Sequence, residues 1–83
     1  MNSLYKTKSN TIIDLSRINA IKEPRVLTVQ GYAFPWGFEV FLCDTEKPVH
    51  FFCAFDTDAN KEIIKSWYDE LVDKWHEFKV ESL

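Results

Sequence analysis

Four side chains in the sequence could bind a soft metal ion or take part in thiol chemistry: Cys43, His50, Cys53 and His76. A zinc site needs such ligands to converge on one point, and a catalytic thiol needs a base within hydrogen-bond reach. Only Cys43 and His50 are expected to approach each other, since the predicted hairpin places both on one face and Cys53 on the other. His76 is expected on the polar side of the C-terminal helix, away from the sheet. We therefore predict neither a metal site nor a cofactor.

The predicted hairpin joins strands at 38–43 and 49–55 through the polar connection 44–47. With a connection of this length His50 lies opposite Phe41, on one face of the pair. A one-residue bulge would exchange the two faces, so the assignment depends on the register.

A thiol-dependent enzyme or a small-ligand site would use Cys43 as the nucleophile and His50 as its base, with Glu39 orienting the imidazole. The chain has two glycines in total and no Gly-rich loop that could donate several backbone N–H groups to an oxyanion. We therefore predict no catalytic activity and keep the thiol site as an alternative.

Residues 56–60 (DTDAN) resemble the start of an EF-hand calcium loop. The sixth position of such a loop needs Gly and is Lys61 here, and the twelfth needs Glu and is Trp67. Acidic and hydroxyl side chains are also typical of a helix N-terminus, and this explains the segment better.

The segment after this cap has a helical period. An apolar arc repeats over residues 57–79 and predicts one long amphipathic helix. Its members are Ile63, Ile64, Trp67, Leu71, Trp75 and Phe78.

The remainder of the chain has the alternation and the β-branched and aromatic content of strands. Residues 4–8 form a short strand within a frayed N-terminal segment, 1–10. Residues 34–37 (FPWG) form a turn, because proline removes a ladder donor and glycine permits unusual dihedral angles. The other strands are predicted at about 11–18, 25–33, 38–43 and 49–55.

These elements make one domain over residues 1–83. Strands followed by a single helix predict an α+β fold, in which the helix packs on a mostly antiparallel, curved sheet of four or five strands.

The segment 13–18 (IDLSRI), followed by Ile21, hairpin strands and a C-terminal amphipathic helix, resembles the small prokaryotic and phage domains with a pleckstrin-homology-like arrangement. The resemblance implies a partial barrel and a role in binding or assembly. It carries no site residues over to this chain.

One helix can cover only one face of the sheet. The predicted core face combines Phe38, Val40, Leu42, Val49, Phe51, Cys53 and Phe55 with the helix arc. The opposite face needs another cover: the N-terminal strands closing a barrel, a second copy in a homodimer, or another protein. The residues of this candidate interaction face are Trp36, Glu39, Phe41, His50 and Phe52.

Charge is uneven along the chain, whose net charge is -3. Residues 1–30 carry five basic and two acidic side chains, and the remainder carries five basic and eleven acidic ones. The polar side of the helix forms an acidic strip that could dock a basic protein surface, including the N-terminal part of a second copy. Its members are Glu62, Asp69, Glu70, Asp73 and Glu77.

The acidic balance argues against nucleic-acid binding, although the aromatic run 50–55 (HFFCAF) keeps single-stranded nucleic acid as a second alternative. No segment has the apolar length of a signal peptide or a membrane span, and two cysteines are too few for a secreted disulfide scaffold. The sequence thus predicts a small cytoplasmic module for protein–protein interaction or assembly.

Overall fold

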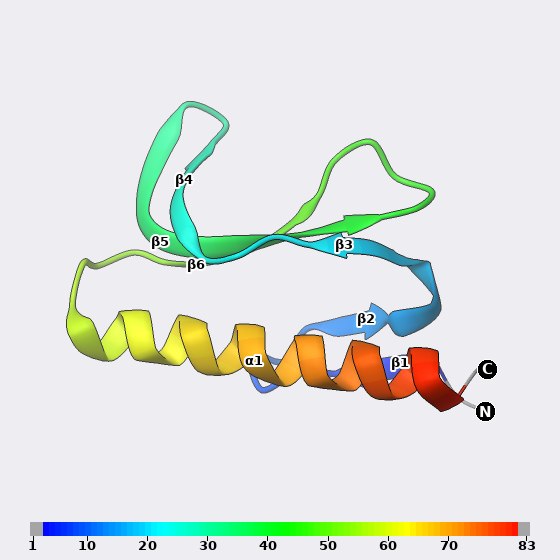
Figure 1. The fold of residues 1–83 in the computed structure, drawn as a ribbon. Coiled ribbons are helices and arrows are strands. Elements are labelled where there is room, and N and C mark those ends of the chain that lie inside the picture. Colours follow the sequence, from blue (N-terminus) through cyan, green and yellow to red (C-terminus); the bar gives the residue numbers. More distant parts are fainter. Residues whose placement is uncertain (1–2, 82–83) are drawn as a thin grey trace.

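Figure 1 shows the fold as a computed structural model, which describes residues 3–81. A curved antiparallel sheet forms the upper layer, and helix α1 lies below it with a small two-stranded sheet. This is the predicted α+β fold, with a slightly higher strand count. The elements are β1 (Leu4–Lys6), β2 (Ile12–Asp14), a 3-10 turn (Leu15–Arg17), β3 (Ile18–Ile21), β4 (Arg25–Val29), β5 (Tyr32–Leu42), β6 (Val49–Cys53) and α1 (Asp58–Glu81).

Strand β5 is the centre of the upper, four-stranded sheet. Strand β6 pairs with one of its edges, while β4 and β3 share the other edge, beside the first and second halves of β5. Both β3 and β4 contain a register shift, whereas β6 pairs with β5 over five consecutive residues. The sheet is therefore open, with one irregular edge and one regular edge.

The β4–β5 hairpin bends away from α1 (Figure 1), and we call its residues 25–36 the arm. Its turn is Gln30 and Gly31, with φ of 51° and 84°. Two successive positive φ angles are typical of the type I′ turn that fits the twist of a hairpin. The predicted turn at 34–37 was wrong, because these residues lie inside β5. Pro35 falls within the register shift between β4 and β5, where its missing N–H interrupts no regular pairing.

The predicted strand at 11–18 is interrupted after Asp14. The Asp14 carboxylate accepts hydrogen bonds from the backbone N–H of Ser16 at 3.0 Å and from its hydroxyl at 2.6 Å. An Asp side chain that bonds two residues ahead stabilises a turn in place of the sheet ladder. The chain therefore makes a 3-10 turn at Leu15–Arg17 before β3 begins.

The N-terminal hairpin β1–β2 lies beside α1, on the lower side of the upper sheet (Figure 1). The Tyr5 hydroxyl donates a hydrogen bond to the Glu70 carboxylate, which also accepts one from the backbone N–H of Lys8 at 3.3 Å. The hairpin thus shares the core with the helix. Barrel closure over the opposite sheet face, one of the three covers expected, does not occur within residues 3–81.

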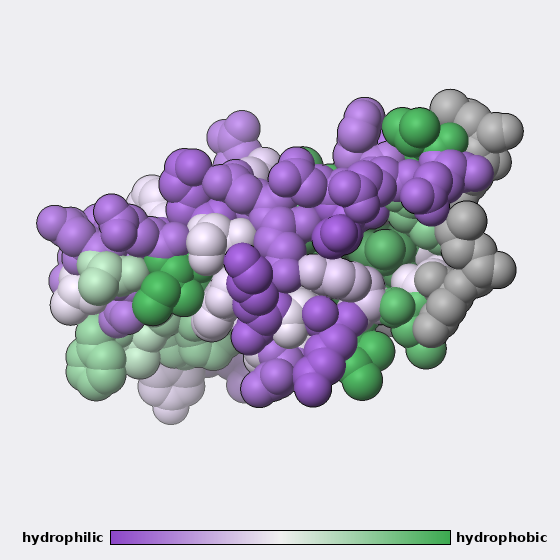
Figure 2. Space-filling model, turned by 90° about the horizontal axis from the view of Figure 1, so that it is seen from below, coloured by the Kyte–Doolittle hydropathy of each residue, from purple (hydrophilic) through white to green (hydrophobic). Residues whose placement is uncertain are grey.

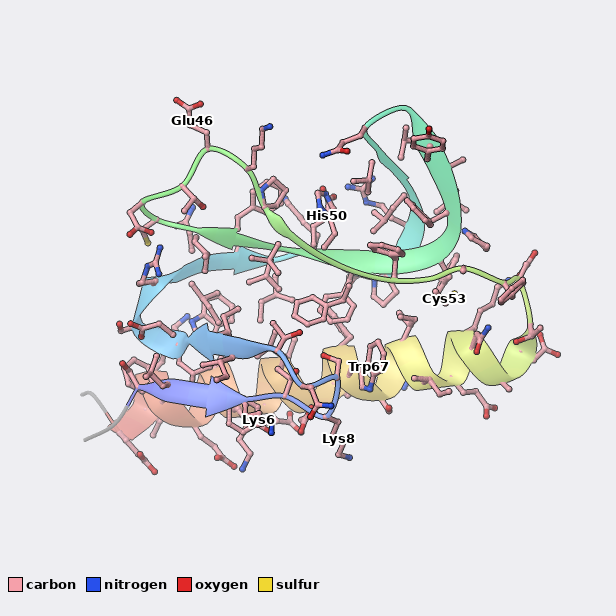
Figure 3. All side chains as sticks on the ribbon, turned by 180° about the vertical axis from the view of Figure 1, so that it is seen from behind. Lys6, Lys8, Glu46, His50, Cys53 and Trp67 are labelled. Carbon is pink, nitrogen blue, oxygen red and sulfur yellow. The ribbon has the colours of Figure 1, made fainter. Side chains whose placement is uncertain are left out.

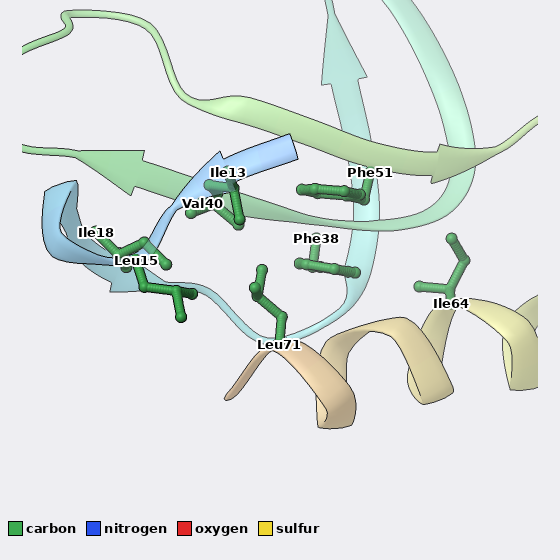
Figure 4. Packing of buried hydrophobic residues seen from close by; sticks show 8 residues of the cluster. All are labelled: Ile13, Leu15, Ile18, Phe38, Val40, Phe51, Ile64 and Leu71. Carbon is green, nitrogen blue, oxygen red and sulfur yellow. The ribbon is translucent and has the colours of Figure 1, made fainter. Parts of the chain in front are cut away.

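The core lies between the two layers (Figure 4). The rings of Phe38 and Phe51 stack with centroids 4.8 Å apart, and Tyr68 meets Phe38 edge-on at 5.6 Å. Helix α1 contributes Ile64 and Leu71, both with 0% exposure. Burial of each such side chain stabilises the fold by about 1.5–3 kcal/mol. The buried cluster consists of Ile13, Leu15, Ile18, Phe38, Val40, Phe51, Ile64 and Leu71.

Two residues of the predicted core are exposed. Ile63 is 45% exposed, because the line that faces the sheet follows Ile64 and Leu71, and Ile63 lies about 100° around the helix from it. Phe55 is 72% exposed, because β6 ends before it. The other predicted members are partly buried against the core: Leu42, Val49, Cys53, Trp67, Trp75 and Phe78.

The predicted cap of the helix is confirmed. The Thr57 hydroxyl accepts a hydrogen bond from the backbone N–H of Asn60 at 3.1 Å, and its carbonyl accepts one from Lys61 N–H at 3.0 Å. The helix then runs to Glu81, two residues further than predicted.

Candidate functional site

The face of the four-stranded sheet turned away from α1, which we call the upper face, carries four of the five predicted interaction residues. The pairing of β5 with β6 places Glu39 opposite His50, two residues from the predicted partner Phe41. A shift by two residues keeps each side chain on its predicted face. Figure 3 accordingly shows His50 above the sheet, while Trp67 rises from α1 on the other side.

A charged group occupies the centre of the upper face. The Glu39 carboxylate accepts a hydrogen bond from the Arg25 guanidinium, and its second oxygen lies 3.3 Å from Nε2 of His50. The Glu39 side chain is 13% exposed and that of His50 is 22% exposed. The carboxylate therefore ties β4 to β6 across β5 and positions the imidazole, as the sequence suggested for Glu39.

Aromatic contacts fix the base of the arm on the same face. The ring centroids of Phe34 and Phe52 lie 4.1 Å apart, and the Leu27 residue is 2% exposed. A Cβ atom added to Gly37 would lie 2.8 Å from Leu27 Cδ1 and from Phe52 Cβ. The sheet thus covers part of its own aromatic face by folding the arm over it, which requires glycine at position 37.

The rest of the upper face stays open. Phe41 is half-buried, with Nζ of Lys22 5.9 Å from its ring centroid, and Phe52 is 40% exposed. A cavity of about 360 Å³ lies between the arm and the 43–48 loop. Its lining consists of Thr28, Val29, Gln30, Lys47, Pro48 and His50.

Trp36, the fifth predicted interaction residue, lies on the opposite side. It pairs with Cys53 and packs against the core on the side of α1. Because residues 34–37 belong to a strand, Trp36 shares a face with Phe38 rather than with its neighbours on the upper face. It lies in a groove beside the helix.

Hydrophilic side chains run along the solvent side of α1 (Figure 2), and the predicted acidic strip among them is largely engaged within the molecule. Asp69 pairs with Lys65 at 2.9 Å, and the pKa of that lysine is raised by the hydrogen bond. Glu77 lies 3.5 Å from Lys74. Glu62 and Asp73 form no ion pair with any described residue.

Glu70, the remaining member of the strip, holds the N-terminal hairpin. Its hydrogen bond to the phenol, together with burial, raises the pKa of Tyr5 to about 12. Glu70 is therefore a structural residue of the layer below the sheet.

The residues considered for thiol chemistry do not assemble. Cys43 is exposed just beyond the end of β5, and its backbone N–H donates to the carbonyl of Arg17 at 2.8 Å. With His50 opposite Glu39, the two side chains are separated by four residues along the sheet, or about 13 Å. Within residues 3–81 no group of three or more His, Cys, Asp or Glu side chains could hold a metal ion.

The outer edge of β6 is the other feature of this region. The Phe51 carbonyl points towards β5, where it approaches Gly37 closely. The alternate residues His50 and Phe52 therefore direct their backbone N–H and C=O groups outwards. Within the described part of the chain, no strand pairs with this edge.

The two edges of the sheet differ in protection. The β3 and β4 edge has two register shifts, with Pro24 between the strands and charged side chains on either side of it. Such devices prevent an edge from accepting another strand. Strand β6 (VHFFC) has no bulge, proline, lysine or acidic residue, and its exposed edge lies beside Phe52.

Comparison with known proteins gives no relative: no family model, no curated protein and no solved structure matches the chain. None of the helical structure described is long and apolar enough to cross a membrane.

Three residues of the upper face escaped the sequence prediction. Arg25, Leu27 and Phe34 reach it because the arm folds back, and this is a long-range contact. One local signal was available: the polar dipeptide Gln30-Gly31 between two apolar runs is compatible with a two-residue hairpin turn.

Proposed function

We propose that the protein is a small, non-catalytic interaction module that assembles with a second copy through the outer edge of β6. The observation that carries this proposal is the contrast between the two edges of the sheet. One edge has the features that block strand addition, and the other is regular, uncharged and flanked by an exposed phenylalanine.

A second copy fits this edge for a geometric reason. An antiparallel pair of identical strands has a twofold axis perpendicular to the sheet, so each copy offers the same backbone groups to the other. Residues 49–53 carry no Asp, Glu, Lys or Arg, so two copies meet there without repulsion between fixed charges. The two sheets become one continuous sheet, and Phe52 of each copy is covered.

The short outer edge of β6 limits the affinity of the proposed dimer. Five residues provide a few backbone hydrogen bonds, each with a net contribution of about 0.5–1.5 kcal/mol. The added side-chain contact is confined to the exposed part of Phe52 and its neighbours. An interface of this kind falls below about 1,200 Å² and is typical of weak association. We expect a dissociation constant of about 0.1 mM.

The test is a concentration series by size-exclusion chromatography with light scattering. The average mass should rise from 9.8 kDa towards twice that value as the concentration approaches about 0.5 mM. Phe52→Lys should remain a monomer throughout, since an edge lysine opposes strand addition. Its unfolding should stay cooperative, because the native side chain is 40% exposed.

Tyr32→Lys is the matched control. Tyr32 is an aromatic residue with 73% exposure at the tip of the arm, away from β6, so this variant should dimerise like the wild type. A wild-type protein that stays monomeric over the whole series would contradict the proposal. Equal dimerisation of wild type and Phe52→Lys would also contradict it.

The compartment is part of the same proposal. Both cysteines are free thiols, and Cys43 is exposed. Exposed free thiols suit a reducing environment such as the cytoplasm.

A further inference from the structure

A second surface feature is a groove of about 410 Å³ between the first half of α1 and the connection from β3 to β4. Two aromatic side chains, Trp36 and Tyr68, line it and are called its aromatic floor here, and Pro24 also belongs to the lining. The Tyr68 ring is fixed by its edge-on contact with Phe38. The groove is therefore a largely apolar slot. The groove lies on the α1 side of the sheet, whereas Phe52, at the proposed dimer contact, lies on the upper face.

A positive charge already lies against this floor. Nζ of Lys61 lies over the Trp36 ring, 5.1 Å from its centroid. A cation at this distance is attracted by the ring quadrupole, so the exposed part of the indole faces a position that favours positive charge. The same ammonium group lies 3.3 Å from Asp56.

Two of the carboxylates that line the groove are unpaired among the described residues. Glu23 comes from the β3–β4 connection and Glu62 from α1, so they belong to different elements. Neither forms an ion pair with a residue among 3–81. The two lysines of the groove are both paired, Lys61 with Asp56 and Lys65 with Asp69. The unpaired charge of the groove is thus negative.

We propose that this groove binds an arginine side chain presented by a segment of a partner protein. A guanidinium is planar and weakly hydrated, stacks on aromatic rings and forms paired hydrogen bonds with carboxylates. A groove lined by two aromatic rings and by the carboxylates of Glu23 and Glu62 offers partners for both kinds of contact. The volume exceeds that of one side chain, so part of the flanking backbone also fits.

The proposal predicts that two substitutions in the groove change the affinity for arginine in opposite directions. Lys61→Gln removes the internal cation that competes for the Trp36 ring, so it should strengthen arginine binding about threefold. Glu62→Gln removes an attractive charge and should weaken binding about threefold, as expected for an exposed ion pair. Asp73→Asn is the control, because Asp73 is an exposed carboxylate of α1 that lies outside the groove and forms no ion pair with a described residue.

The probe is the tripeptide acetyl-Ala-Arg-Ala-amide, titrated into the 15N-labelled full chain and followed at the indole N–H signal of Trp36. The Phe52→Lys variant, expected to be monomeric, serves as the background, which separates this test from that of the β6 edge. The arginine peptide should shift the Trp36 signal with a dissociation constant in the millimolar range. The same peptide with citrulline, a neutral isostere, should bind at least fivefold more weakly.

Three results would overturn the proposal: equal binding of the citrulline peptide, no strengthening by Lys61→Gln, or shifts that avoid Trp36. Methylguanidine tests whether the groove recognises a protein segment or a small guanidino compound. If it bound as tightly as the tripeptide, the peptide backbone would contribute nothing, and the site would serve a small guanidino compound in place of a protein segment.

Discussion

The fold of the arm depends on Gly37, and replacing this residue with alanine tests it. An added Cβ would lie 2.8 Å from both Leu27 Cδ1 and Phe52 Cβ, and closer still to the Phe51 carbonyl oxygen. The side chains could rotate away, but the carbonyl belongs to the strand pair and cannot. Overpacking of this kind costs typically 1–3 kcal/mol, and contact with backbone places the cost near 3 kcal/mol.

The loss is large for a chain of this size. An 83-residue domain has a free energy of unfolding of about 4–12 kcal/mol, so Gly37→Ala should remove a quarter or more of it. In thermal unfolding, a loss of about 3 kcal/mol corresponds to a fall in Tm of about 12–24 °C. Urea titration followed by circular dichroism measures the free energy directly. Hydrogen exchange should also accelerate at Leu27, because the arm would lift from the upper face.

The other glycine of the chain provides the control. Gly31 needs its positive φ of 84°, but a Cβ there would meet no atom within 4 Å. Asparagine tolerates this backbone conformation, so Gly31→Asn should cost less than about 1 kcal/mol. If Gly37→Ala were as stable as Gly31→Asn, the packing of the arm against Phe52 would be refuted.

Two further predictions concern the layer below the sheet. Leu71→Ala should lower the free energy of unfolding by about 2–5 kcal/mol in urea titrations, because Leu71 has 0% exposure, whereas Ile63→Ala should lower it by less than about 1 kcal/mol. The folded-state pKa of Tyr5, about 12, lies above its ordinary value near 10, so the stabilising bond to Glu70 is complete below pH 10 and is lost as the pH rises towards 12. Tyr5→Phe should lack this step in stability when unfolding is measured from pH 9 to 12.

Each of these two predictions can be contradicted by a specific result. Equal losses for Leu71→Ala and Ile63→Ala would mean that the helix presents a different line of residues to the sheet. A fall in stability between pH 10 and 12 that persists unchanged in Tyr5→Phe would assign it to other groups, and the contact between Tyr5 and Glu70 would not hold the hairpin.

Local patterns determined the helix and the faces of the central strands. The cap at Thr57 and the 3.6-residue period lie within the segment itself, so they predict α1 to within two residues. Side-chain alternation fixed which residues of β5 and β6 share a face. That prediction survived an error of two residues in the register, because a shift by an even number of residues leaves each side chain on the same face.

The site residues were predicted less completely, because side-chain alternation assigns a face only to residues within a predicted strand. Glu39, Phe41, His50 and Phe52 lie in the alternating strands and share the upper face, as predicted from their spacing. Trp36 was assigned to a turn because Pro35 and Gly37 flank it. In the structure neither residue marks a turn. Pro35 lies at a register shift, and Gly37 lies at a close contact between strands.

The sequence by itself thus determined the α+β class, the helix and the two-sided character of β5 and β6, since these follow from neighbours along the chain. Only the tertiary structure decided that the N-terminal hairpin joins α1 below the sheet, that the arm folds over the upper face, and that Trp36 meets Glu62 in one groove. The physical reason is that these contacts join segments separated by many residues. Their free energy depends on complementary shape and charge, which no local period encodes.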